Sequence, residues 1–381
     1  MSRMPGLDLL RALAVLWVMM THTYLTGLFP DGNLVADSGW MGVDLFFALS
    51  GFLIGGQLFR PYVRNEPEHI GLFYFRRLFR TLPPYLVVVA LYFTVPFFRE
   101  RPTLAPLWQY LTFTENLFVA FPRGGFAFSH AWSLCVEEQF YLFMPLLVWL
   151  LMRRPALWKA ATVFAVVVVG GMLLRAGLWL HEVAPVWAND DGPRSTPQFM
   201  ERIYYPTWCR LDGLTGGVIV AAVRAFKPKL WEALGRRANL FLAAGAAVVG
   251  VCIWLFHDQR AFWPSVVGYP LLSLGMASLV FAGANANSLI GRWRIPGAGA
   301  IAAMAYSLYL THKETYHMVH VLWGDALAKD GPLAFAVYAG AAFAVGALLY
   351  VTFERPALIL RDRILKRSAM AQPKIAAARA W

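Results

Sequence analysis

Long runs of apolar residues, separated by short polar segments, dominate the sequence. The longest runs, such as Leu134 to Met152 and Leu333 to Phe353, approach the roughly 20 residues that a helix needs to cross a bilayer. The pattern therefore predicts an all-α fold, a polytopic membrane bundle of about ten transmembrane helices. The expected spans are residues 7–29, 40–59, 82–98, 134–152, 160–180, 206–223, 238–256, 264–283, 295–312 and 332–353.

The composition excludes an ordinary soluble domain. Hydrophobic residues make up 59% of the chain and charged residues 15%, with a mean hydropathy of +0.52, whereas soluble domains carry about a quarter charged residues. No polar segment between the spans is long enough for a second folded domain. We therefore expect one membrane domain, residues 1–356, followed by a basic cytoplasmic tail, residues 357–381. The three cysteines fall at no metal-ligand spacing, so no metal site is expected.

The distribution of charge predicts the orientation of the bundle. If the N-terminus is cytoplasmic and ten helices cross, most of the 34 basic residues fall in cytoplasmic segments, as the positive-inside rule requires. Both termini are therefore expected on the cytoplasmic side. This topology also accounts for the net charge of +12, so no nucleic-acid partner is expected. The first apolar run has no small-residue cleavage site and predicts a membrane span rather than a signal peptide.

The first span carries three ionisable residues on one face. Asp8 and Arg11 are three residues apart and can form an ion pair. His22 lies eleven residues beyond Arg11, in nearly the same direction around the helix and about 16 Å further along its axis. One interpretation is a snorkelling ion pair with a histidine at the membrane interface. The other is an active site in which the imidazole acts as a general base, and the residues alone leave both open.

The second span and the loop after it add a serine and three arginines. Ser50 and Gly51 form a small pair that favours close helix packing over nucleophilic catalysis. Arg76, Arg77 and Arg80 lie between aromatic residues at the cytoplasmic surface. Such arginines either anchor a helix to anionic lipid or bind phosphate groups with their planar guanidinium groups. The sequence does not decide between these roles.

Three further segments carry polar residues at the opposite, outer half of the bundle. Trp132, Glu137, Glu138 and Tyr141 lie where the fourth span begins, and an interfacial aromatic belt explains the aromatics but not the acids. A carboxyl there would orient His22 or hold a polar substrate. The other two segments contain Arg210 and Asp212 at the start of the sixth span, and His312 and Lys313 at the outer end of the ninth. For these residues, structural anchoring and a functional role remain equally open.

Together these motifs resemble those of the acyltransferase-3 family of integral membrane acyltransferases, in the order in which that family has them. The resemblance covers the chain from Leu7 to about Pro356. The matching elements are Leu7 to Ala12, the Arg-x10-His pair Arg11 and His22, Phe47 to Leu53, Arg77 to Arg80, His130 to Tyr141, Arg210 to Leu214, Tyr306 to His312, and Glu354 to Pro356.

The resemblance implies transfer of an acyl group, usually acetyl from acetyl-CoA, to a hydroxyl of a glycan or another small molecule. It implies a multi-pass protein of the bacterial inner membrane, with membrane lipids, acyl-CoA and a hydroxylated acceptor as partners. Acyl-CoA would be a co-substrate, and no tightly bound cofactor is expected. Some members carry an added extracytoplasmic hydrolase-like domain, for which we expect no room here.

The family motifs and the topology together predict a role for each polar residue. CoA would bind from the cytoplasm with its phosphates on the arginines, and its pantetheine arm would run along the first span toward His22, which would act as general base or carry the acyl group. The predicted catalytic residues are His22, Glu137 and Asp8; the donor-binding residues are Arg11, Arg76, Arg77, Arg80 and Ser50; the acceptor-binding residues are Glu138, Tyr141, Trp132, Arg210, Asp212 and His312. The alternative is a secondary transporter or exporter with an intramembrane charge relay, although the two halves show no repeated pattern of broken helices.

Overall fold

The computed structural model describes residues 4–26, 32–66, 70–119, 125–187, 197–327 and 331–378, and every regular element in these ranges is a helix. The main helices are α1 (Pro5–Thr21), α3 (Met41–Val63), α4 (Ile70–Thr94), α6 (Ala131–Arg153), α11 (Leu211–Phe226), α13 (Ala238–Leu255), α14 (Tyr269–Gly283), α16 (Ala298–Trp323) and α17 (Pro332–Leu349). A further long helix consists of α7 (Leu157–Ala165), α8 (Gly171–Leu178) and α9 (Ala184–Trp187), joined by π-helical turns. The all-α prediction is confirmed.

Each of the ten predicted spans falls on one of these helices, although residues 27–29 of the first lie outside the described residues. Six helical segments in the described ranges are long and apolar enough to cross a membrane, so the chain is a multi-pass membrane protein. The total of ten crossings and the cytoplasmic position of both termini remain predictions. The six segments are Met41–Val63, Ala131–Arg153, Leu157–Val186, Ala238–Asp258, Pro264–Gly283 and Pro332–Arg367.

The boundaries of two helices differ from the prediction. Helix α4 begins at Ile70, twelve positions before the expected start, and continues through Pro83 and Pro84. Helix α16 continues to Trp323 instead of ending at residue 312. As a result Lys313, which the topology placed outside the membrane, is buried within the bundle with 2% of its surface exposed. The sequence analysis ended α16 at its polar residues, but those residues face other helices and not water.

Helix α3 lies at the centre of the bundle and packs closely against α11, with α1 and α14 also beside it. Two glycines permit the close approach of α3 and α11. A Cβ atom on Gly51 would meet the carbonyl oxygen of Leu214, and one on Gly217 would meet the carbonyl oxygen of Ala48. Small residues at such crossings let two backbones approach within van der Waals contact. The packing interpretation of Gly51 is therefore confirmed.

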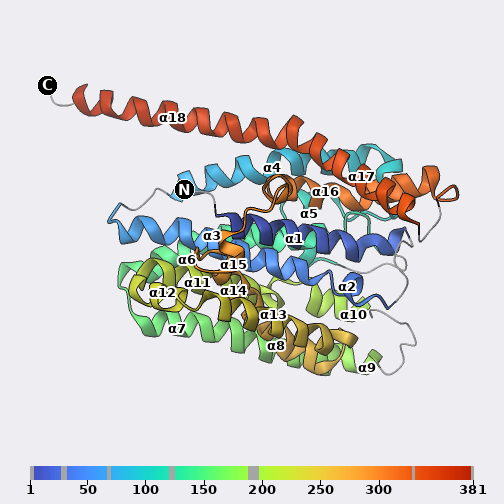
Figure 1. The fold of residues 1–381 in the computed structure, drawn as a ribbon, viewed down its shortest axis with the longest axis horizontal. Coiled ribbons are helices and arrows are strands. Elements are labelled where there is room, and N and C mark those ends of the chain that lie inside the picture. Colours follow the sequence, from blue (N-terminus) through green and yellow to red (C-terminus); the bar gives the residue numbers. More distant parts are fainter. Residues whose placement is uncertain are drawn as a thin grey trace.

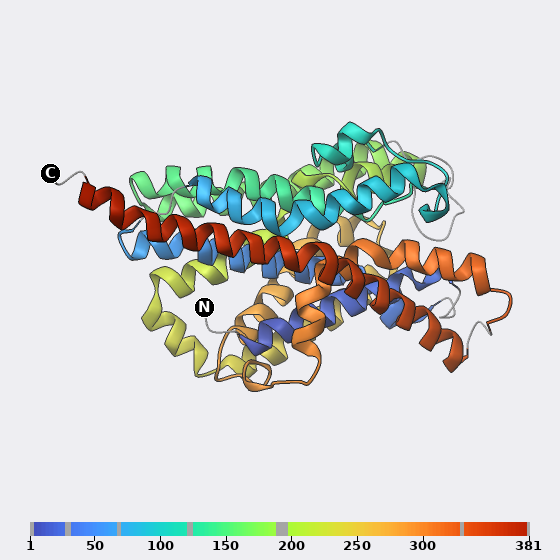
Figure 2. The same ribbon diagram turned by 90° about the horizontal axis from the view of Figure 1, so that it is seen from above.

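The last two helices form one continuous rod. Helix α17 runs through a π-helical turn at Tyr350–Glu354 directly into α18 (Arg355–Ala378), and α18 packs along α4 before extending past the other helices (Figures 1 and 2). Both views place the start of α1 and the end of α18 toward the same end of the bundle. This is the end at which the charge pattern predicts the cytoplasm.

Candidate active site

A cavity of about 830 Å³ lies between α1, α3, α4, α6, α16 and α18. All five residues that were predicted to bind the donor contribute to its wall, together with three predicted site residues of α6. The predicted site residues that line the cavity are Arg11, Ser50, Arg76, Arg77, Arg80, Glu137, Glu138 and Tyr141. The fold therefore brings together side chains that are widely separated in the sequence. Glu137, Glu138 and Tyr141 were expected in the outer half of the bundle, but they line the same cavity as the arginines, because α6 packs with this part of its length beside the start of α4.

The arginines of the cavity are held in place by neighbouring side chains. Arg77 lies over the ring of Tyr141, with its guanidinium carbon 4.8 Å from the ring centroid. Arg80 pairs with Glu354 at 3.2 Å. This carboxyl is fully buried and also accepts a 2.6 Å hydrogen bond from Ser307. The contacts give the Glu-Arg-Pro motif a physical role, because its glutamate fixes an arginine of the Arg-x-x-Arg motif.

The predicted ion pair in the first helix is present. Arg11 and Asp8 approach to 3.5 Å, which confirms that they share one face of α1. Arg11 lines the large cavity, whereas Asp8 lines a separate, smaller pocket beside Trp293 and Arg294. The catalytic role predicted for Asp8 stays a prediction, and the geometry favours a role in positioning Arg11.

Glu137 is bound within the cavity wall. Its Oε1 atom accepts a 2.8 Å hydrogen bond from Ser50, and its Oε2 atom accepts one of the same length from Tyr141. Both carboxylate oxygens thus bind side chains of the cavity wall. The sequence analysis offered Glu137 as an orienting partner of His22, whereas the structure gives that part to a residue of α16.

His22, at the end of α1, lies against His312 of α16 and close to His130. Its Nδ1 atom is 2.7 Å from His312 Nε2, and the ring centroids of His22 and His130 are 6.3 Å apart. We call these three residues the histidine cluster. No group of three or more His, Cys, Asp or Glu residues in the described ranges has the arrangement of a metal site. Sequence reasoning missed His130, although it opens the motif that contains Glu137.

The contacts of His312 fix the position of the protons in the pair. Its Nδ1 atom lies 2.8 Å from the carbonyl oxygen of Tyr309 and 3.1 Å from that of Leu308. A carbonyl oxygen only accepts, so this nitrogen carries the proton and the Nε2 atom of a neutral His312 is an acceptor. His22 must then donate from Nδ1, which leaves the lone pair on its Nε2 atom.

A buried cation lies beside the histidine cluster. Lys313 Nζ is 3.1 Å from Glu100 Oε1 and 2.8 Å from Ser129 Oγ. Glu100 also accepts hydrogen bonds from Tyr92 at 2.9 Å and from the backbone of Phe128 at 3.0 Å. Sequence reasoning missed this pair, because it placed Lys313 outside the membrane and did not consider Glu100. The polar residues after Leu310 could have indicated this pair, because they continue α16 into the bundle instead of ending it at the membrane surface.

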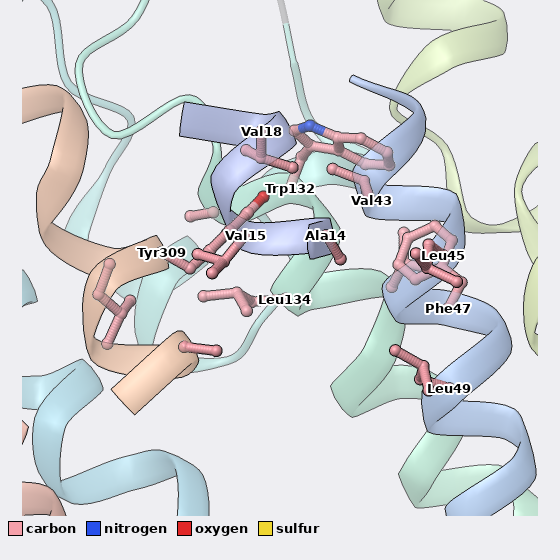
Figure 3. Close-up of a cluster of buried hydrophobic side chains, with 14 of the residues drawn as sticks. Ala14, Val15, Val18, Val43, Leu45, Phe47, Leu49, Trp132, Leu134 and Tyr309 are labelled. Carbon is pink, nitrogen blue, oxygen red and sulfur yellow. The ribbon is translucent and has the colours of Figure 1, made fainter. Parts of the chain in front are cut away.

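One layer of side chains separates the cavity from the histidine cluster. Tyr309 donates a 3.0 Å hydrogen bond to the carbonyl oxygen of His130, so its oxygen accepts the 2.6 Å hydrogen bond from Ser133 Oγ. Both side chains line the cavity, whereas none of the three histidines is among its lining residues. Figure 3 shows Tyr309 extending from α16 into the buried cluster formed by α1, α3 and α6. The arginines and His22 therefore lie on opposite sides of this layer.

Arg210 forms a buried ion pair with Asp44 of α3. The guanidinium Nη2 atom is 3.0 Å and 2.9 Å from the two carboxylate oxygens. The group lies among three aromatic rings, with Trp132 at 5.1 Å, Tyr204 at 4.7 Å and Tyr269 at 4.3 Å. Arg210 and Trp132 were predicted to bind the acceptor. That role stays a prediction, because the contacts in this structure join helices inside the bundle.

Asp212 pairs with Arg175 of α8 and not with its neighbour Arg210. The closest approach is 2.7 Å, and the same guanidinium group donates to the carbonyl oxygen of Cys209 at 2.7 Å. Both partners are buried. The acceptor-binding role predicted for Asp212 is likewise untested, and the geometry favours a structural one.

We expect Arg210→Met to destabilise the folded protein by about 3–5 kcal/mol, because it leaves the charge of Asp44 buried without a partner. Adding Asp44→Asn should restore much of the lost stability, since the second substitution removes that charge. Thermal unfolding of the detergent-purified protein measures both effects. An Arg210→Met protein that melts like the wild type but has lost turnover would instead support substrate binding.

A multi-pass helical bundle that places a cationic cavity against a histidine cluster has the arrangement expected of a membrane acyltransferase. The profile of the acyltransferase-3 family, described as an acyltransferase domain, matches residues 4–351. The chain therefore belongs to this family, as its motifs indicated.

Similar curated proteins carry related names. An O-acetyltransferase OatA of Staphylococcus aureus strain NCTC 8325 / PS 47 is 28% identical over 326 residues, which are 81% of this chain and 50% of that protein. A putative O-acetyltransferase, SAS0844, of Staphylococcus aureus strain MSSA476 is 28% identical over 351 residues, which are 85% of this chain and 52% of that protein. The chain thus spans about half the length of these relatives. No solved structure matches it significantly.

Proposed function

We propose that this protein is a membrane O-acyltransferase that moves an acyl group, most simply acetyl, from cytosolic acyl-CoA to a hydroxyl of a glycan or a similar acceptor. The observation that carries the proposal is the placement of an arginine-lined cavity and a histidine cluster on two sides of one side-chain layer. The names of the relatives support the acetyl group. We place the protein in the bacterial inner membrane, with the cavity facing the cytoplasm.

The donor would bind through its phosphates. Arg77 presents a planar guanidinium group fixed on Tyr141, and such groups bind phosphate oxygens through two parallel hydrogen bonds. Arg11, Arg76 and Arg80 add positive charge around the same space. The cavity is also deep enough in the bundle to reach Tyr309, so the pantetheine arm would point its thioester toward the histidine cluster.

The acceptor would react on the other side of the layer. His22 Nε2 would take the proton of the acceptor hydroxyl while the hydroxyl oxygen attacks the thioester carbonyl. The C–S bond then breaks, and the CoA thiolate receives the proton from His22. In a second route His22 Nε2 would attack the thioester carbonyl and the C–S bond would break, which releases the CoA thiolate. The acceptor hydroxyl would then attack the acyl carbon, the C–N bond to His22 would break, and the hydroxyl proton would pass to the thiolate. In both routes the Tyr309–Ser133 layer must open, because it separates the reacting groups.

Incubation of the purified full-length protein with radiolabelled acetyl-CoA tests this proposal. We expect slow release of labelled acetate without an acceptor, and labelling of glycan when membrane glycans or soluble oligosaccharides are added. Heat-denatured protein is the control. A secondary transporter or exporter would produce neither product at any donor concentration, and that result would reject the acyltransferase assignment.

A further inference from the structure

Helix α18 forms one wall of the arginine-lined cavity. Arg361, Asp362 and Leu365 all contribute to the lining, and the helix is held there by its packing along α4. These residues lie beyond residues 4–351, which match the family, and no recognised motif includes them. The cavity therefore contains Arg361 in addition to the arginines of α1 and α4.

The position of Arg361 along the cavity follows from the hairpin of α16 and α17. These two helices pack side by side and run in opposite directions, and Glu354 at the end of the hairpin bonds Ser307 of α16. Tyr309 lies further along α16, toward the histidine cluster. Past Glu354 the rod continues away from Tyr309. At a rise of 1.5 Å per residue, Arg361 therefore lies about 10 Å further from Tyr309 than Glu354 does. Arg361 is therefore at the mouth of the cavity.

In the described part of the chain, the side chain of Arg361 forms an ion pair with the acid next to it in the sequence. Its Nε and Nη2 atoms lie 2.9 Å and 2.8 Å from Asp362 Oδ1. The Asp362 side chain is 57% exposed and that of Arg361 23% exposed. An ion pair between adjacent, hydrated residues is weak, so a phosphate dianion can replace the carboxylate. Asp362 also places a negative charge where an anionic ligand would enter.

We propose that Arg361 binds the 3′-phosphate of the CoA donor at the mouth of the cavity, and that Asp362 competes with this phosphate for its guanidinium group. The inference rests on the proposed function, which requires the thioester to point toward Tyr309. The adenosine end of CoA must then stay at the mouth. Its 3′-phosphate is the one charged group of CoA that is separate from the diphosphate, and Arg361 lies about 10 Å along the rod beyond Glu354, the residue that holds Arg80.

Binding of CoA and of 3′-dephospho-CoA to the full-length protein, measured by titration calorimetry in detergent, tests the proposal. We expect the wild type to bind CoA at least about 10-fold more tightly than 3′-dephospho-CoA, since a charge-assisted bond of this type is worth that much. Arg361→Ala should bring this ratio close to one, with the affinity for 3′-dephospho-CoA unchanged. Asp362→Asn should have the opposite effect and tighten the binding of CoA.

The matched control is Arg363→Ala, which removes the same charge from an exposed position of α18 outside the cavity lining and should leave the ratio unchanged. Gel filtration of each variant establishes that it is folded. The inference is wrong if Arg361→Ala leaves the ratio unchanged or weakens both ligands equally. Failure of the proposed function gives a different result, in which the wild type binds neither nucleotide.

Discussion

His22→Ala is expected to lower the rate of acyl transfer by about 10²–10⁴-fold, the usual contribution of a general base. The hydrogen bond to His312 leaves the lone pair of His22 on Nε2, and alanine offers no group that takes the proton of an acceptor hydroxyl. The measurement is turnover of labelled acetyl-CoA by purified protein. Binding of CoA should be retained, because His22 does not line the cavity.

Variants of His312 separate its positioning role from a direct one. His312→Gln keeps an oxygen that accepts the Nδ1 proton of His22, so it should retain more activity than His312→Leu. His317→Ala, which removes a histidine of α16 outside the cluster, serves as the control and should be fully active. Wild-type turnover by His22→Ala would rule out His22 as the base.

Arg77→Ala should weaken the binding of acetyl-CoA by about 10- to 100-fold, the value of one charge-assisted hydrogen-bonding group. The expected loss is large because Arg77 is fixed over Tyr141 before the donor binds. Arg77→Lys should recover little, since an ammonium group neither stacks on the ring nor forms two parallel bonds. Titration calorimetry with acetyl-CoA measures the dissociation constant.

Arg153→Ala is the matched control for this substitution. Arg153 also stacks on an aromatic ring at the same end of the bundle, with its guanidinium carbon 3.8 Å from the centroid of Trp149, but it does not line the cavity. The variant should bind acetyl-CoA like the wild type. If the Arg77→Ala protein binds acetyl-CoA as tightly as the wild type does, Arg77 does not bind the donor. Anchoring of α4 to anionic lipid would then be the better explanation of its arginines.

The helices of the fold and the composition of the cavity could be predicted because both depend on local patterns. Runs of apolar residues predicted where helices lie, and the three-residue spacing of Asp8 and Arg11 predicted their contact. Family motifs assigned the arginines of α4 to the donor and Glu137 to catalysis, but Glu137 was expected in the outer half of the bundle. Their meeting in one cavity depends on which helices are neighbours, and hydrophobic periodicity does not contain that information.

The partners of the buried charges could not be predicted from adjacency. Arg210 and Asp212 are two positions apart, and residues with that spacing point in different directions from a helix. Each therefore pairs with another helix, Arg210 with Asp44 and Asp212 with Arg175. The partner of His22 is 290 positions away in the chain. Such contacts depend on how far each helix is shifted along the membrane normal relative to its neighbours. The requirement of roughly 20 apolar residues for a span fixes that shift only to within about one or two helical turns.

The layer formed by Tyr309 and Ser133 has a consequence for the energy supply of the cell. A path open to water from the cytoplasm to the outer surface would let protons flow down the electrochemical gradient that drives ATP synthesis. In the part of the chain that the structure describes, the arginine-lined cavity stops at Tyr309. Under the proposed function, an uncharged acyl group would cross this layer without a continuous path of water, so the membrane would keep its voltage during transfer.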